Sequence, residues 1–192
     1  MTTRPRRRLA AVLLAATAFV AACGDDDEDV SATPGDQEPA ETSTSAAPAA
    51  ETVTVTAVDY EFQGLPAEIG AGTKINFVNT STVEAHEFVA VRIPDTETRP
   101  VSELVQLPEE EIQALFGSGP PATVLLAGPN RGEVIQAVGD GTISQPGRYA
   151  VVCFIPVGAD PAVVLDPEAE GPPQSDSPPH AARGMFAELD VK

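Results

Sequence analysis

The 192-residue chain contains few of the side chains that bind soft metals: two histidines, two cysteines and two methionines. One methionine opens the chain, and one cysteine, Cys23, directly follows an N-terminal apolar run. The rest of the chain contains two histidines, one cysteine and one methionine: His86, His180, Cys153 and Met185. Two histidines are too few for any site that needs a histidine cluster, which excludes copper enzymes that act on oxygen or nitrite.

The usual sequence signatures of catalysis are also missing. The chain has no glycine-rich phosphate loop, no serine nucleophile elbow and no HExxH helix. We therefore expect a protein that is not an enzyme and that has no small-molecule substrate.

Basic residues are scarce, with 11 lysines and arginines against 29 acidic residues. Four arginines precede Cys23 and every acidic residue follows it, so seven basic and 29 acidic residues give the later part a net charge of −22. This charge argues against nucleic acid and against electrostatic adsorption to anionic lipid. It favours a basic or neutral protein partner.

The four remaining side chains together supply two imidazoles, one thiolate and one thioether. These are the donors of a blue-copper electron-transfer centre, in which two His and one Cys lie in a plane and Met is a weak axial ligand. Taken singly, each has an ordinary role, because a lone buried Cys is usually a small hydrophobe and a lone Met usually belongs to the core. A structural zinc site needs four strong ligands, and a thioether is a poor fourth. The joint occurrence predicts one copper site.

The first 22 residues predict export. Arginines at positions 4 and 6–8 precede the apolar run Leu9 to Val20, whose twelve residues are too few to span a bilayer, which needs roughly 20. Val20-Ala21-Ala22 before Cys23 resembles a bacterial lipobox, which implies a lipidated Cys23 after cleavage. We expect an exported, extracytoplasmic or periplasmic lipoprotein, lipid-anchored to the outer face of the cell membrane. The alternative is an ordinary cleaved secretory signal with a cysteine nearby by chance.

Residues 23–50 are expected to form a flexible tether. The segment opens with five consecutive acidic residues and continues in Ser, Thr, Pro, Ala and Glu without any aromatic residue. Such a composition cannot bury enough apolar surface to offset the entropy lost on ordering. As a flexible coil it would reach roughly 30 Å, which leaves residues 51–192 as one domain.

The pattern of that domain predicts an all-β fold. Short alternating strands separated by Gly, Pro and Asn turns are typical of a β-sandwich. One helix is expected from Pro108 to Phe116, and Pro146-Gly147 is expected to form a hairpin turn before the strand that leads to Cys153. The strands are expected at 52–58, 74–79, 87–93, 122–126, 133–138, 148–154 and 186–191.

The chain from residue 51 onward resembles the cupredoxin family of plastocyanins and azurins. The resemblance depends on Asp59-Tyr60-Glu61-Phe62, Ala71-Gly72-Thr73, Asn79, His86, Cys153, His180 and Met185, in that order. It implies a cupredoxin-like Greek-key β-sandwich with one short helix. It also implies one type 1 copper per chain, with His86, Cys153 and His180 as equatorial ligands and Met185 as the axial ligand. The copper would cycle between Cu(I) and Cu(II) and pass single electrons from a donor protein to an acceptor protein.

Two features differ from that family. Twenty-six residues separate Cys153 from His180, so residues 157–179 are interpreted as a long inserted loop, with a short helical turn near 160–165. The insert would act as a lid or present a surface for partner recognition. Glu87 follows the first histidine where the family often has an Asn that ties the ligand loops together. Asn79 and Glu87 are therefore candidates for shaping the surroundings of the metal.

Electron transfer is the preferred function, and two alternatives stay open. The first is a copper-binding lipoprotein that buffers, delivers or senses copper without a redox partner. The second is a sandwich domain that has kept the ligands but works in adhesion or assembly. Copper-handling proteins tend to carry additional Met or His tracts, and this chain has none.

Overall fold

The computed structural model describes residues 51–117, 119–168 and 175–192. The predicted signal peptide, the tether and Cys23 lie outside these residues, as do residues 169–174 of the insert. Within the described part of the chain, no helix is long and apolar enough to cross a membrane.

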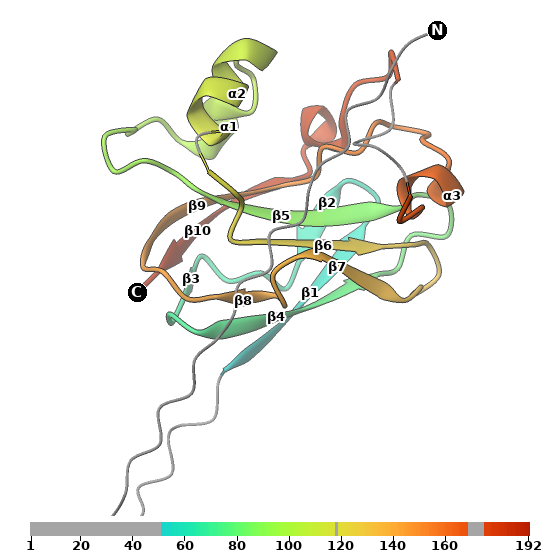
Figure 1. Ribbon diagram of the computed structural model, residues 1–192, viewed down its shortest axis with the longest axis horizontal. Helices are drawn as coiled ribbons and strands as arrows, with labels where there is room; N and C mark the ends of the chain where they lie inside the picture. The colour runs from blue at the N-terminus through green and yellow to red at the C-terminus, as the bar shows by residue number, and fades with distance from the viewer. Residues whose placement is uncertain (1–50, 118, 169–174) are drawn as a thin grey trace, which may run out of the picture. The chain divides into compact units, whose positions relative to one another are not determined.

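The described residues form two β-sheets stacked face to face, with two helices on the outer side of one sheet (Figure 1). The four-stranded sheet has the order β2-β1-β4-β8 and the six-stranded sheet the order β3-β10-β9-β5-β6-β7. The first sheet contains β1 (Thr52–Val58), β2 (Glu61–Gln63), β4 (Thr73–Asn79) and β8 (Thr142–Ile143). The second contains β3 (Glu68–Ile69), β5 (His86–Arg92), β6 (Thr123–Ala127), β7 (Val134–Val138), β9 (Gly147–Val152) and β10 (Phe186–Val191).

The strands of the smaller sheet follow the simple alternation of a sheet with one buried face. In β4, Thr73, Ile75 and Phe77 are buried, while Lys74 and Asn76 between them are exposed. A strand with this period of two turns its apolar set to one side, here toward the other sheet. β1 and β4 pair in parallel along most of their length.

The central strand of the larger sheet is buried on both faces. Tyr149 and Val151 of β9 belong to the core between the sheets, whereas Ala150 and Val152 pack in a second apolar cluster on the outer face. That cluster includes Leu104 of α1 (Val101–Leu104), and Phe116 at the end of α2 (Glu109–Phe116) packs against it. The uninterrupted apolar run of β9 is therefore explained by layers on both sides.

Three phenylalanines fill the core between the sheets. The ring centroids of Phe62, Phe77 and Phe88 lie 5.8–6.4 Å apart in tilted and edge-on arrangements. Phe88 is fully buried. Truncating a buried phenylalanine to alanine costs about 3–5 kcal/mol, so Phe88 contributes a large share of the stability that holds β5 in place.

The prediction of a β-sandwich is confirmed, with differences in detail. All seven predicted strands are present with ends shifted by at most two residues, and α2 matches the predicted helix with Pro108 at its N-cap. The predicted helical turn in the insert is α3 (Pro161–Val164), whose N-cap Asp160 accepts a hydrogen bond from the Ala162 N–H. The two- and three-residue strands β2, β3 and β8, the helix α1 and the 3₁₀ helix η1 (His180–Arg183) were not anticipated.

The prediction of a hairpin at Pro146-Gly147 is wrong. The segment connects β8 to β9, and these strands belong to different sheets. β8 pairs with β4, so the Pro-Gly step carries the chain across the sandwich instead of reversing it within one sheet. A Pro-Gly pair marks a change of direction without specifying the partner strand.

The strand order of the larger sheet brings the ends of three strands close together. β9 is antiparallel to both β5 and β10. The start of β5, the end of β9 and the start of β10 therefore meet at one end of the sandwich, the end at which α3 lies (Figure 1).

Candidate metal centre

The four predicted ligands lie at these strand ends or on the short helix that precedes β10. His86 is the first residue of β5, and Cys153 directly follows β9. His180 opens η1, and Met185 stands between η1 and β10. All four side chains are fully buried, with no exposed surface. Neighbouring strands and one short helix thus fix the backbone of every predicted ligand.

The donor atoms of three ligands converge. Nδ1 of His86 lies 3.1 Å from Nδ1 of His180, which lies 3.3 Å from Sγ of Cys153. The three potential ligand atoms all lie within 4.8 Å of one another. A first-row metal ion binds nitrogen and sulfur at about 2.0–2.3 Å, so three trigonal donors would be separated by about 3.5 Å. The spacing, the burial and the donor types fit a single copper ion.

The backbone of Met185 is tied to two of these residues. Its N–H donates to the His180 carbonyl at 3.1 Å, and its own carbonyl accepts the Cys153 N–H at 3.2 Å. Gly184, just before it, has φ of +108°, a left-handed conformation that ends η1 and that glycine adopts without strain. These bonds hold Met185 beside the cluster, and its axial role stays a prediction.

A short ladder of hydrogen bonds brings Cys153 and His180 together despite the 26 residues between them. The Ala181 N–H donates to the Cys153 carbonyl, and the His180 N–H donates to the Ile155 carbonyl, both at 2.9 Å. Pro156 and Pro179 form an isolated antiparallel bridge, and the Val157 N–H donates to the Pro178 carbonyl at 3.0 Å. The insert therefore leaves and rejoins the metal loop through a paired stem.

Glu87 links the two central ligand strands. Its backbone N–H approaches Sγ of Cys153 at 3.5 Å, and its side-chain Oε1 accepts the Phe154 N–H at 2.7 Å. One residue of β5 thus contacts both the cysteine sulfur and the residue that follows it. The glutamate makes a connection between ligand-bearing segments of the kind expected from the family's asparagine.

Asn79, at the end of β4, holds the loop that leads to His86. Its Nδ2 donates to the carbonyls of Glu84 and Ala127, at 2.9 and 3.0 Å, and its Oδ1 accepts the Ser81 N–H at 2.9 Å. Every polar atom of this fully buried amide has a partner. Asn79 therefore ties the loop, at Ser81 and Glu84, to the end of β4 and to Ala127 of β6.

Burial dominates the electrostatics of the cluster. Burial, helped by the nearby His180, lowers the pKa of His86 to about 4. It also lowers the pKa of His180, against the opposing effect of Glu84. Burial and the nearby Glu87 raise the pKa of the Cys153 thiol. The imidazoles are therefore neutral at neutral pH, as metal ligands must be, and the thiol loses its proton when a metal binds.

Burial raises the pKa of Glu87 to about 7, although the hydrogen bond from Phe154 acts in the opposite direction.

Glu84 is a residue of the site that the sequence analysis did not identify. It lies against His180, with its Oε2 3.7 Å from Nε2 of the imidazole. A single glutamate in a polar loop carries no sequence signal for this position.

The chain is similar to three solved structures of one protein group. The auracyanin from Roseiflexus castenholzii, reduced with Na-dithionite, is 20% identical over 74% of this chain and 98% of its own, with a TM-score of 0.41. Auracyanin A, a "blue" copper protein of Chloroflexus aurantiacus, is 18% identical over 73% and 98%, with a TM-score of 0.38. Auracyanin B is 17% identical over 74% and 89%, with a TM-score of 0.32.

No protein-family model and no curated protein sequence matches the chain. The two-sheet sandwich and the His-Cys-His cluster, described above from the strand pairing and the interatomic distances, have the features of a cupredoxin domain.

Proposed function

We propose that this protein binds one copper ion through His86, Cys153, His180 and Met185 and carries single electrons between protein partners. The observation that carries the proposal is the convergence of two imidazole nitrogens and one thiol sulfur in a fully buried position. Two borderline nitrogen donors, one soft sulfur and an adjacent thioether are the donor set of an electron-transfer copper site.

The fold supports electron transfer by holding the ligands still. Bound copper would supply the one-electron chemistry by cycling between Cu(I) and Cu(II). β5 and β9 fix two of the ligands through their ladder, and the stem of the insert fixes His180. A site that is rigid before the metal binds changes little between oxidation states, which keeps the reorganisation cost of each electron transfer low.

Burial of the site also limits the chemistry. The side chains of His86, Cys153, His180 and Met185 are inaccessible to solvent. No further histidine exists in the chain to bind a substrate or to transfer protons. These features favour an electron carrier over a copper enzyme.

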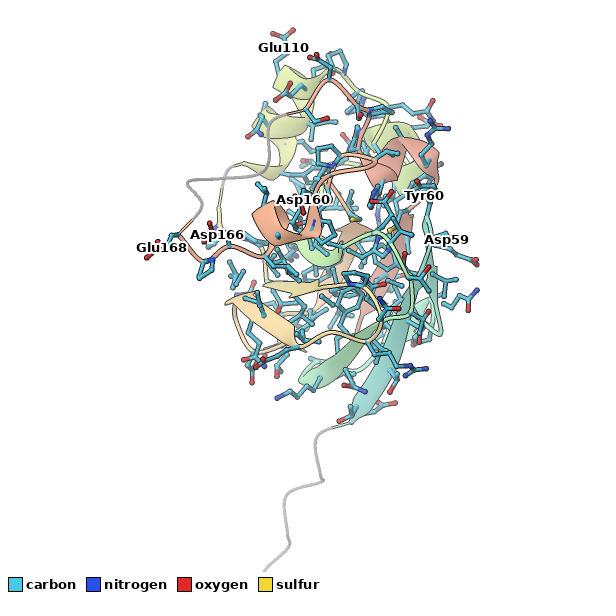
Figure 2. All side chains as sticks on the ribbon, turned by 90° about the vertical axis from the view of Figure 1, so that its right-hand side faces the viewer. Asp59, Tyr60, Glu110, Asp160, Asp166 and Glu168 are labelled. Atoms are coloured by element: carbon cyan, nitrogen blue, oxygen red, sulfur yellow. The ribbon has the colours of Figure 1, made fainter. Side chains whose placement is uncertain are left out.

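We also propose that the protein is exported and lipid-anchored through Cys23, with the copper domain facing outward on its tether. The support is the basic start, the short apolar run and the lipobox-like residues before Cys23. The redox partner is expected to be basic or neutral, because Asp59, Asp160, Asp166 and Glu168 project around the end of the domain seen in Figure 2.

The direct test is a titration of the metal-free domain, residues 51–192, with Cu(II). The proposal predicts binding of one ion per chain, with an intense visible absorption from the thiolate-to-copper transition and the matching electron paramagnetic resonance signal. A pale, weakly absorbing complex at the same stoichiometry would refute the proposed blue-copper site.

A further inference from the structure

The outer edge of the His180 ring has an incomplete environment. Its Nε2 is buried and has no hydrogen-bond partner among the described residues. The carboxylate oxygen Oε2 of Glu84 lies 3.7 Å from this nitrogen, slightly too far for a hydrogen bond. A shift of a few tenths of an ångström would make it one.

Glu84 is held in this position by several contacts. Its other oxygen, Oε1, accepts the Tyr60 hydroxyl at 3.4 Å and the Gly158 N–H at 3.2 Å. Its backbone N–H donates to Ser81 Oγ at 3.0 Å, and its carbonyl accepts Asn79 Nδ2. The side chain is only 14% exposed. Because Oε1 is already engaged, Oε2 is the oxygen left for His180.

Tyr60 closes the same edge of the ring. Its ring centroid lies 5.0 Å from that of His180 at a tilt of 59°, and its hydroxyl points to Glu84. Tyr60 and Glu84 therefore stand together beside the imidazole. Tyr60 is labelled in Figure 2, on the end of the domain that faces the viewer. Gly158, which donates to Glu84, belongs to the insert and adds a third segment of the chain to this group.

Ligand geometry decides where the proton of His180 must be. A neutral imidazole carries one N–H, and Nδ1 is the nitrogen that faces Cys153 and His86. If Nδ1 is to bind a metal, the proton must be on Nε2, where a buried N–H without an acceptor would cost free energy. A carboxylate acceptor fixes both the tautomer and the orientation of a metal-binding histidine.

We propose that Glu84 is a positioning residue: its carboxylate accepts the Nε2–H of His180 and so holds Nδ1 toward the metal position. The electronic consequence rests on the proposed copper function. A negative charge beside the imidazole stabilises Cu(II) more than Cu(I), because the oxidised ion carries the larger positive charge. Glu84 therefore lowers the reduction potential of the site.

The first experiment uses the metal-free domain and does not depend on copper. Long-range ¹H–¹⁵N spectra at pH 8 should show His180 with its proton on Nε2, shifted downfield and slow to exchange with water. Glu84→Gln should move this proton upfield and speed its exchange, and Tyr60→Phe should do so to a smaller extent. A proton on Nδ1, or an Nε2 proton unchanged in Glu84→Gln, would overturn the proposal.

The second experiment compares copper-loaded variants. Glu84→Gln should raise the reduction potential and weaken Cu(II) binding by about 10- to 100-fold, with a smaller loss for Cu(I). A merely structural role would weaken both ions alike and leave the potential unchanged, which contradicts the proposal.

Glu68→Gln is the matched control, because it also removes one negative charge. Glu68 is 63% exposed and pairs with Asp190, about 17 Å along β10 from Met185. The reduction potential of Glu68→Gln should equal that of the unaltered protein. An equal rise in both variants would assign the effect to net charge and refute the proposed role of Glu84. If the unaltered protein binds no copper, the copper function fails, and the metal-free spectra still decide the role of Glu84.

Discussion

The sulfur of Cys153 lies 3.3 Å from Nδ1 of His180 and receives the backbone N–H of Glu87 at 3.5 Å. Both contacts are formed by atoms whose positions depend on the backbone of β5 and η1. They place the thiol against the His180 imidazole and beside the strand that carries His86. The scarcity of His, Cys and Met singled out these residues in the sequence, since the only other copies are Met1 and Cys23.

Replacing Cys153 tests the origin of the expected colour. Cys153→Ser preserves the size of the side chain but removes the thiolate, so the intense absorption should disappear and copper binding should weaken. His86→Ala and His180→Ala should each weaken or relax the site while some sulfur-to-copper absorption remains. Visible and electron paramagnetic resonance spectra of the three variants measure this. Full colour in Cys153→Ser would exclude the assigned sulfur ligand.

Met185 tests how the axial position acts. Axial ligands tune the potential more than they decide binding, so Met185→Leu should bind copper with a raised potential and Met185→Gln with a lowered one. Leucine is close to methionine in volume, and the free energy of unfolding should fall by less than about 1.5 kcal/mol. Potentials and thermal unfolding of both variants are the measurements. Loss of copper in both would give Met185 a structural role instead.

The paired stem is the element that lets a long insert coexist with a compact metal loop. Two of its bonds flank the insert, between Cys153 and Ala181 and between Ile155 and His180, and a third joins the two ends of the insert, Val157 and Pro178. Gly158 adds a contact to Glu84. The described parts of the insert, residues 159–168 and 175–177, therefore adjoin a base that is already closed.

Replacing residues 159–177 with a short Gly/Ser connector tests this separation. The stem remains, so the copper spectrum should be retained, whereas electron-transfer rates with charged redox reagents should change. Val164 of α3 is buried in the main core, and its loss should lower the free energy of unfolding by about 1.5–3 kcal/mol. Stopped-flow rates, spectra and thermal unfolding check the prediction. A colourless product would show that the insert itself positions His180.

The strands were predictable because their signals are local. The alternation in β1 and β4 and the apolar run of β9 follow from side chains adjacent in sequence. The stem and the sheet change at Pro146-Gly147 were not predictable, because both depend on pairing between distant segments. The position of Glu84 against His180 likewise results from folding and not from a motif. α1 has only four residues, too few to show helical periodicity.

The charge and the N-terminal segment define how the whole protein would operate. With a net charge of −22 after residue 23, electrostatic binding to anionic lipid is unfavourable, so the proposed membrane attachment would depend on acyl chains at Cys23. Cys23→Ala should move the full-length protein from the membrane fraction to the soluble fraction, which fractionation and immunoblotting measure. Ser31→Ala, in the same tether, is the control and should leave it in the membrane fraction. Retention of Cys23→Ala in the membrane would refute the lipid anchor.

The central claim is that the bound metal changes oxidation state reversibly without leaving the protein. Cyclic voltammetry of the copper-loaded domain, residues 51–192, tests it most directly. The proposed function predicts one reversible one-electron couple, with copper retained through repeated cycles, because the ligands are held by the sandwich in both states. An irreversible couple, or release of copper on reduction, would contradict electron transfer and favour copper storage or delivery.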